Sequence, residues 1–144
     1  MKMTTKVQRR HTRWVVALAI GHVLARMGAQ IILSPSAWAV EADFDHARRP
    51  YGAEWRQAYT TLSALYDIAV IGVSGVGWIP AGPWAGRKLI GCSLAVGPGG
   101  AILIEGPYGE AAEVVVTVDV TLQPALARGT GFADVLRERG YRGP

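Results

Sequence analysis

Cys92 is the single cysteine of this 144-residue chain and its most obvious candidate nucleophile. A cysteine thiolate attacks a carbonyl or nitrile carbon when a neighbouring cation or base lowers the thiol pKa. Cys92 instead lies within the apolar run Leu89–Val96, between Gly91 and Ser93. A free cysteine in such a run usually packs as a small hydrophobic residue. We therefore predict a packing role for Cys92, and one cysteine excludes both a disulfide framework and a cysteine-based zinc site.

The histidines do not form a recognisable metal-binding set. His11, His22 and His46 are far apart in the sequence, and His46 lies in a loop with Asp43 and Asp45. That loop could hold a cation weakly, but a hydrated acidic loop is expected because no further ligands converge on it in the sequence. We therefore predict no metal and no cofactor.

An acid–base pair is not evident either. Lys88 precedes an apolar run and is predicted to lie at a solvated strand end. No spacing typical of acid–base chemistry joins the glutamates Glu41, Glu54 and Glu105. The glycine-rich stretches Gly75–Gly86 and Gly97–Gly100 lack the Gly-Lys-Ser/Thr pattern that opens a phosphate-binding helix. They are predicted to form turns.

Helices and short apolar runs alternate along the first half of the chain. Residues Arg13–Met27 carry apolar side chains at helical spacing and end at Gly28, a typical helix C-cap. Residues Ala53–Tyr66 predict a second helix. Gln30–Leu33 and Asp67–Ser74 are β-branched runs typical of buried parallel strands. This order predicts an α/β fold in which a right-handed helical crossover joins parallel strands.

The second half of the chain predicts β-structure. Leu89–Val96 and Ala101–Glu105 are expected to pair as a hairpin around the intervening glycine turn, and Glu113–Val120 is expected to form a last strand. Ser36–Gly52 and Gly75–Gly86 are predicted to be loops, because proline and glycine interrupt them.

The charge and hydropathy of the chain limit the classes of partner that it could have. The net charge is +4, and basic residues gather near both ends without a groove-reading motif, so we predict no nucleic-acid partner. The apolar run Trp14–Ala25 is shorter than a membrane span and contains His22, so we predict no membrane partner and a cytoplasmic protein. An exported protein remains an alternative, because Ala37–Ala39 is similar to a signal-peptidase site and cleavage there would leave Val40 at the N-terminus.

Three blocks, in order, resemble the nitrilase family of carbon–nitrogen hydrolases. They are GAQIILSPSAW (Gly28–Trp38), VIGVSGVG (Val70–Gly77) and GRKLIGCSLAVGPGGAILIEGP (Gly86–Pro107). With the elements between them, they span roughly residues 14–120 and resemble the C-terminal half of the family's domain. The resemblance implies an α/β fold, a partial αββα sandwich in which two such layers pair across a dimer interface. The asparagine often found near Ser74 or Gly75 in the family is absent.

The resemblance also implies a chemistry that this sequence does not carry. Family members hydrolyse amides, nitriles or N-carbamoyl compounds with a glutamate, a lysine and a cysteine. The glutamate and lysine come from the half that precedes these blocks. The nucleophile precedes the first helix, where the nearest residue here is Thr12, whose hydroxyl is a poor substitute for a thiol. No catalytic residue is therefore assigned.

Three residues are candidates for a substrate pocket. The resemblance places the loop of Ser36 and Trp38 at the carboxyl ends of the strands, where open α/β sheets generally bind ligands. Trp38 either lines an acyl pocket or caps the core. Trp84, in Gly82-Pro83-Trp84, is a further candidate for the same pocket.

The sequence thus predicts a carbon–nitrogen hydrolase of the nitrilase or amidase type, truncated and inactive alone. A small amide or nitrile would be the substrate of the completed enzyme. The alternative is a noncatalytic half-domain that docks on a complete homologue or on a separately encoded first half. The expected partner is a second copy of the chain or the missing N-terminal half. We predict a disordered or foreign start at residues 1–12, the hydrolase-like part at 13–121, and a tail at 122–144 with a short helix at Phe132–Arg139.

Overall fold

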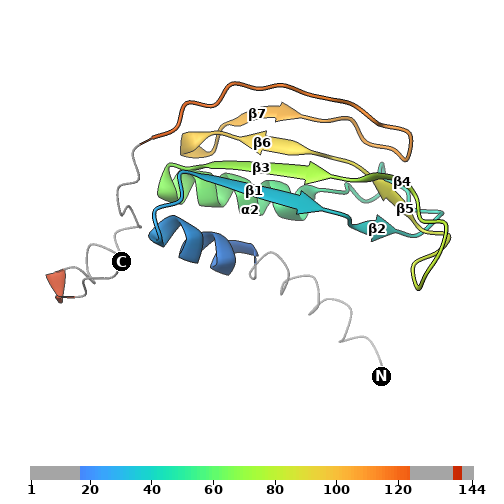
Figure 1. Cartoon of the computed structure of the whole chain (residues 1–144), viewed down its shortest axis with the longest axis horizontal. Coiled ribbons are helices and arrows are strands. Elements are labelled where there is room, and N and C mark those ends of the chain that lie inside the picture. Colours follow the sequence, from blue (N-terminus) through green and yellow to red (C-terminus); the bar gives the residue numbers. More distant parts are fainter. Residues whose placement is uncertain (1–16, 124–137, 141–144) are drawn as a thin grey trace.

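The computed structural model describes residues 17–123 and 138–140 (Figure 1). The predicted start at 1–12 and almost all of the predicted helix Phe132–Arg139 lie outside these residues. A helix over residues 17–26 comes first. The elements that follow are β1 (Ile31–Ser36), β2 (Ala39–Val40), α2 (Ala53–Tyr66), β3 (Ala69–Ser74), β4 (Val76–Trp78), β5 (Lys88–Ile90), β6 (Leu94–Val96), a 3-10 turn (Pro98–Gly100) and β7 (Ile102–Glu105).

The described strands form two sheets. The larger has the order β1-β3-β6-β7, with β1 and β3 parallel and the other pairs antiparallel. The smaller has the order β2-β5-β4 and is antiparallel. In Figure 1 the smaller sheet lies beyond the carboxyl ends of β1 and β3. A helical crossover between parallel strands is confirmed, because α2 lies between β1 and β3 in the sequence and these strands pair in parallel. Its right-handedness stays a prediction.

Both helices pack against the same face of the larger sheet. The core contains Ala25 from the first helix, Tyr59 and Leu62 from α2, and Val70 and Val96 from neighbouring strands. Val70 and Val96 are partners in the β3–β6 ladder, so their side chains share one face. The described part of the chain therefore consists of one helical layer on one sheet layer.

Two glycines let the layers approach closely. A Cβ at Gly72 of β3 would lie 2.4 Å from the Tyr59 ring, so only a residue without a side chain fits beneath that ring. A Cβ at Gly21 would lie 2.3 Å from a methyl carbon of Leu62, which marks the contact between the first helix and α2. Gly21, although unfavourable in a helix interior, is thus explained by packing.

The predicted strand Leu89–Val96 is wrong as a single element. It is split into β5 and β6, which belong to different sheets. Gly91 and Cys92 between them have φ values of 74° and 66°, and two successive left-handed residues turn the chain out of a straight strand. Cys92 therefore lies at a break between strands and not inside one.

The predicted last strand Glu113–Val120 is also wrong. Its valines favour an extended chain, but a strand requires a hydrogen-bonded ladder, and residues 113–120 form none with the described strands. Val115 is 94% exposed, so its side chain does not pack against a sheet face. In Figure 1 this segment runs alongside β7 without joining the sheet.

Smaller differences concern element boundaries. The first strand continues past Leu33 through Pro35 to Ser36, which is permitted because β1 is an edge strand and the missing N–H of Pro35 costs no ladder bond on the outer side. The loops predicted at Ser36–Gly52 and Gly75–Gly86 contain the short strands β2 and β4, which pair with β5. The helix Ala53–Tyr66 and the hairpin of β6 with β7 are confirmed.

The fold is α/β and corresponds to a partial αββα sandwich, with one α layer and one β layer. Within residues 17–123 and 138–140, no helix has the length and apolar character needed to cross a membrane.

Candidate functional site

A cavity of about 420 Å³ opens beside the start of α2. Its walls come from β2 and the adjoining loop, from the first turn of α2 and from the residue preceding β5. We call it the Trp38 cavity. The lining residues are Trp38, Ala39, Val40, Glu41, Phe44, Arg49, Pro50, Tyr51, Gly52, Ala53, Glu54, Trp55 and Arg87.

Aromatic rings form much of the wall. The ring centroids of Trp38 and Trp55 are 6.0 Å apart, and Tyr51 meets Trp55 edge-to-face at 4.7 Å. Phe44 meets Tyr51 edge-to-face at 5.9 Å. The Tyr51 hydroxyl donates a hydrogen bond of 2.6 Å to the backbone carbonyl of Trp38. This bond and the ring contacts join the loop after β1 to the start of α2 and give the cavity a fixed apolar side.

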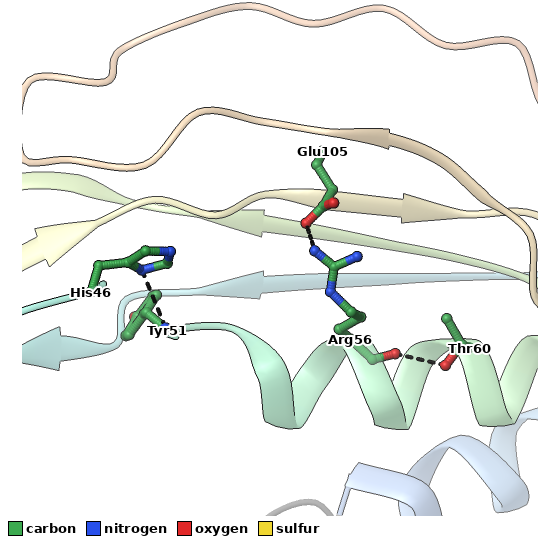
Figure 2. A network of polar contacts seen from close by, with 5 residues as sticks. All are labelled: His46, Tyr51, Arg56, Thr60 and Glu105. Atoms are coloured by element: carbon green, nitrogen blue, oxygen red, sulfur yellow. Dashed lines mark hydrogen bonds and ion pairs between the residues drawn. The ribbon is translucent and has the colours of Figure 1, made fainter. Parts of the chain in front are cut away.

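The Tyr51 hydroxyl remains protonated at any physiological pH. Burial raises its pKa well above the ordinary value, and the nearby Cys92 raises it further. The hydroxyl is therefore available as the donor to Trp38. The backbone N–H of Tyr51 donates a hydrogen bond of 3.2 Å to Nδ1 of His46, which Figure 2 shows. The His46 ring in turn stacks on the Tyr108 ring, with the ring centroids 3.8 Å apart.

Four charged side chains line the cavity: Glu41 and Arg87 form an ion pair, whereas Arg49 and Glu54 form none with the described residues. Arg87 forms a salt bridge of 2.6 Å with Glu41, so these two charges offset each other. The guanidinium of Arg49 lies 4.6 Å from the Phe44 ring centroid, and among the described residues no carboxylate lies within salt-bridge distance of it. Its neighbour Arg48 is not among the lining residues and pairs with Asp45 at 3.4 Å. Arg49 is thus the cation at the cavity that is not offset by an ion pair.

The three residues predicted for a substrate pocket occupy different places. Trp38 lines the cavity. Ser36 ends β1, where its hydroxyl lies 3.1 Å from that of Ser74 at the end of β3. Trp84 is 54% exposed in the turn before β5, and its ring carries the guanidinium of Arg87 at 4.6 Å. Trp84 therefore touches a residue of the wall, while Ser36 belongs to a hydroxyl pair at the strand ends. Thr12 lies outside the described residues.

Cys92 lies beside the cavity but outside its lining. It borders a separate hollow of about 20 Å³ together with Tyr51, Arg56 and Glu105. Burial raises the pKa of the Cys92 thiol, the Glu105 carboxylate raises it further, and the Arg56 guanidinium lowers it. Figure 2 shows Arg56 in an ion pair with Glu105, which divides its charge between two neighbours. The balance favours the neutral thiol, which is a poor nucleophile.

The prediction that Lys88 lies at a solvated strand end is wrong. It begins β5, the central strand of the smaller sheet, and its side chain is only 15% exposed. Its ammonium lies 5.7 Å from the Trp78 ring centroid and 3.8 Å from a carboxylate oxygen of Glu110. Lys88 is also the ladder partner of Trp78 in β4, so the lysine has structural partners in the smaller sheet and beside it.

Sequence reasoning missed most of the cavity wall. Tyr51 and Arg49 lie next to Pro50 in a segment that the sequence predicts only as a loop, and Trp55 lies in a segment that it predicts only as a helix. One signal was available: aromatic residues flank the helix start as Tyr51-Gly-Ala-Glu-Trp55. Among the described residues, no group of three or more His, Cys, Asp or Glu side chains could hold a metal ion.

No protein-family model matches the chain, and no curated protein matches it in sequence. Among solved structures, the chain is similar to a carbon–nitrogen hydrolase from Helicobacter pylori G27, with 23% sequence identity and a TM-score of 0.51. The match covers 62% of this chain and 32% of the hydrolase chain, so this chain spans less than two thirds of that protein's length. The likeness shows the fold: one part of a carbon–nitrogen hydrolase-like α/β architecture.

The raised pKa of Cys92 predicts slow, strongly pH-dependent alkylation. In the folded chain the thiolate should form at higher pH than in the same chain unfolded in urea, because burial and Glu105 both disfavour the charged form. The rate of iodoacetamide labelling, followed by mass spectrometry across pH, measures this. If the pH midpoint of labelling in the folded chain were at or below the pH midpoint in the unfolded chain, the cysteine would be activated and the packing role would be contradicted.

Proposed function

We propose that this chain supplies one αβ layer of a carbon–nitrogen hydrolase of the nitrilase or amidase type and does not hydrolyse substrates by itself. The observation that carries the second half of this proposal is the state of Cys92. It is the single thiol of the sequence, and burial raises its pKa. The likeness of the fold to a carbon–nitrogen hydrolase supports the first half.

A nucleophilic thiol needs a base within hydrogen-bond reach or a cation that stabilises the thiolate. The cation that lowers the pKa of Cys92 is Arg56, and Arg56 already forms an ion pair with Glu105. That same carboxylate raises the thiol pKa. The amide N–H of Cys92 donates to the carbonyl of Pro107 at 3.3 Å, which fixes the residue in the break between β5 and β6. These contacts support a structural residue.

The contribution of this layer to an enzyme would be the Trp38 cavity. The cavity has the size of small-molecule sites and a lining that mixes aromatic with charged side chains, and it lies beyond the carboxyl end of β1, as is general for ligand sites of open α/β sheets. In this proposal the substrate is an amide, nitrile or N-carbamoyl compound, and the reacting groups are provided by another polypeptide segment.

The purified chain is expected to release no ammonia from acetamide, benzonitrile or an N-carbamoyl amino acid above the buffer rate. The matched control is Cys92→Ser, which should behave identically, because the thiol has no catalytic part. An enzyme-coupled ammonia assay provides the measurement. Ammonia release that rises with chain concentration and disappears in Cys92→Ser would overturn the proposal.

A second candidate function is docking without catalysis, and the open face of the larger sheet favours it. Leu33 is 70% exposed and Val73 is 59% exposed, on the face opposite to the helices. Leu33 is the ladder partner of Ile71, two residues before Val73, so these side chains share that face. Adjacent exposed apolar side chains on a sheet commonly mark an interaction surface. We propose that a second copy of this chain covers it.

Sedimentation of the purified chain tests this docking. We expect one discrete oligomer for the unmodified chain, and a shift toward the monomer when Leu33→Asn and Val73→Thr are combined, because polar groups would then be buried at the interface. Val115→Thr is the matched control, since Val115 is 94% exposed in a different part of the chain. A monomeric or polydisperse unmodified chain would exclude a specific homo-oligomer through this face.

A further inference from the structure

The Trp38 cavity combines two indole rings, tilted at 47° to each other, with one cation, Arg49, for which the described residues form no ion pair. Trp38 and Trp55 present indole rings whose centroids are 6.0 Å apart, and Arg49 lies on the same lining. A cavity of about 420 Å³ falls within the range that holds a small organic molecule. Its lining therefore defines both a shape and a charge for the ligand.

We propose that the Trp38 cavity binds a small aryl carboxylate, with the ring against the indoles of Trp38 and Trp55 and the carboxylate on Arg49. An arginine guanidinium presents paired N–H donors that match the two oxygens of a carboxylate. The proposal concerns the cavity that the proposed function assigns to a substrate, but its test is distinguishable from that function, because it measures binding to this chain alone and involves no turnover.

The local charges favour an anion at the Arg49 end. Arg87 pairs with Glu41 and Arg48 pairs with Asp45, whereas Arg49 has the Phe44 ring as its described neighbour. Glu54 also lines the cavity and opposes an anion near its own carboxylate. It lies in the first turn of α2, where the positive end of the helix dipole offsets an acidic side chain.

The same contacts disfavour a cationic ligand. Aromatic cages do bind ammonium groups through the faces of their rings. Here the Phe44 face already carries the Arg49 guanidinium, and the face of the nearby Trp84 carries that of Arg87. A ligand cation would therefore enter beside two protein cations, one of which is not offset by a carboxylate.

Fluorine NMR titrations with three matched probes test the charge preference. The probes are para-fluorobenzoate, its uncharged analogue para-fluorobenzamide, and the cation para-fluorobenzylammonium, each added to the complete chain at low salt. We expect the benzoate to bind most tightly. The variant Arg49→Gln should weaken benzoate binding by about tenfold, the effect of losing a charge-assisted hydrogen bond, while leaving benzamide binding unchanged.

Arg48→Gln is the matched control, because Arg48 precedes Arg49 and pairs with Asp45 away from the cavity lining. It should leave all three affinities unchanged. Trp38→Ala should weaken both benzoate and benzamide, which locates the ring at the indole wall. The proposal is overturned by equal binding of benzoate and benzamide in the unmodified chain, by tighter binding of the ammonium probe, by equal effects of the two arginine variants, or by no binding at all. The first two of these outcomes need no variant, so a folding defect in Arg49→Gln cannot obscure the result.

Discussion

The ring of Tyr59 lies against the bare backbone of Gly72, and the position of α2 depends on this contact. No side chain fits at position 72, because a Cβ added to Gly72 would lie 2.4 Å from the Tyr59 ring. The Tyr59 hydroxyl continues across the sheet and donates to the Ser34 hydroxyl of β1 at 2.9 Å. One buried tyrosine thus fixes α2 over both parallel strands. At its other side α2 meets the hairpin turn, where a Cβ on Gly100 would lie 2.9 Å from the carbonyl of Thr60.

The placement of α2 determines the two features that bear on function. Its first turn, from Gly52 to Trp55, forms one wall of the Trp38 cavity. Gly52 also lies against Cys92, since a Cβ there would be 3.5 Å from the cysteine Cβ. The helix start therefore separates the aromatic cavity from the thiol. The chain therefore has the Trp38 cavity on one side of the helix start and a half-buried, neutral cysteine on the other.

The sequence predicts the helices and the parallel pairing of β1 with β3, because apolar periodicity and β-branched runs are local signals. It is wrong about burial in two places. The strand predicted to be buried, β1, is an exposed edge strand. In the first helix, Ile20, Val23 and Met27 of the apolar stripe are exposed, while Ala25 packs in the core. The helix Ala53–Tyr66 agrees with the structure at both ends. The break at Gly91-Cys92 could not be anticipated in the same way, because the apolar run continues through it and the positive φ values depend on contacts with Gly75 and Pro107. The segment 113–120 shows the converse: β propensity alone does not supply a ladder partner.

Only part of the candidate site could be predicted from the sequence. Trp38 was placed near a pocket through a resemblance of its loop, and the structure puts its ring on a cavity wall. The difference between Arg48 and Arg49 is invisible in sequence, because it depends on which partner each side chain meets in space. Their opposite environments, Asp45 for one and the Phe44 ring for the other, result from the path of a single loop.

Hydrogen–deuterium exchange of the Gly72→Ala chain tests most directly whether the Tyr59–Gly72 contact fixes the position of α2 and, through it, the wall of the Trp38 cavity. We expect the amides of residues 51–55 and 91–93 to exchange faster together with those of α2, because displacing the ring moves the helix start as well as its middle. Val73→Ala, on the exposed side of the same strand, should leave these segments at the level of the unmodified chain. Faster exchange confined to β3 and the middle of α2, with residues 51–55 unaffected, would contradict the dependence of the cavity on this contact.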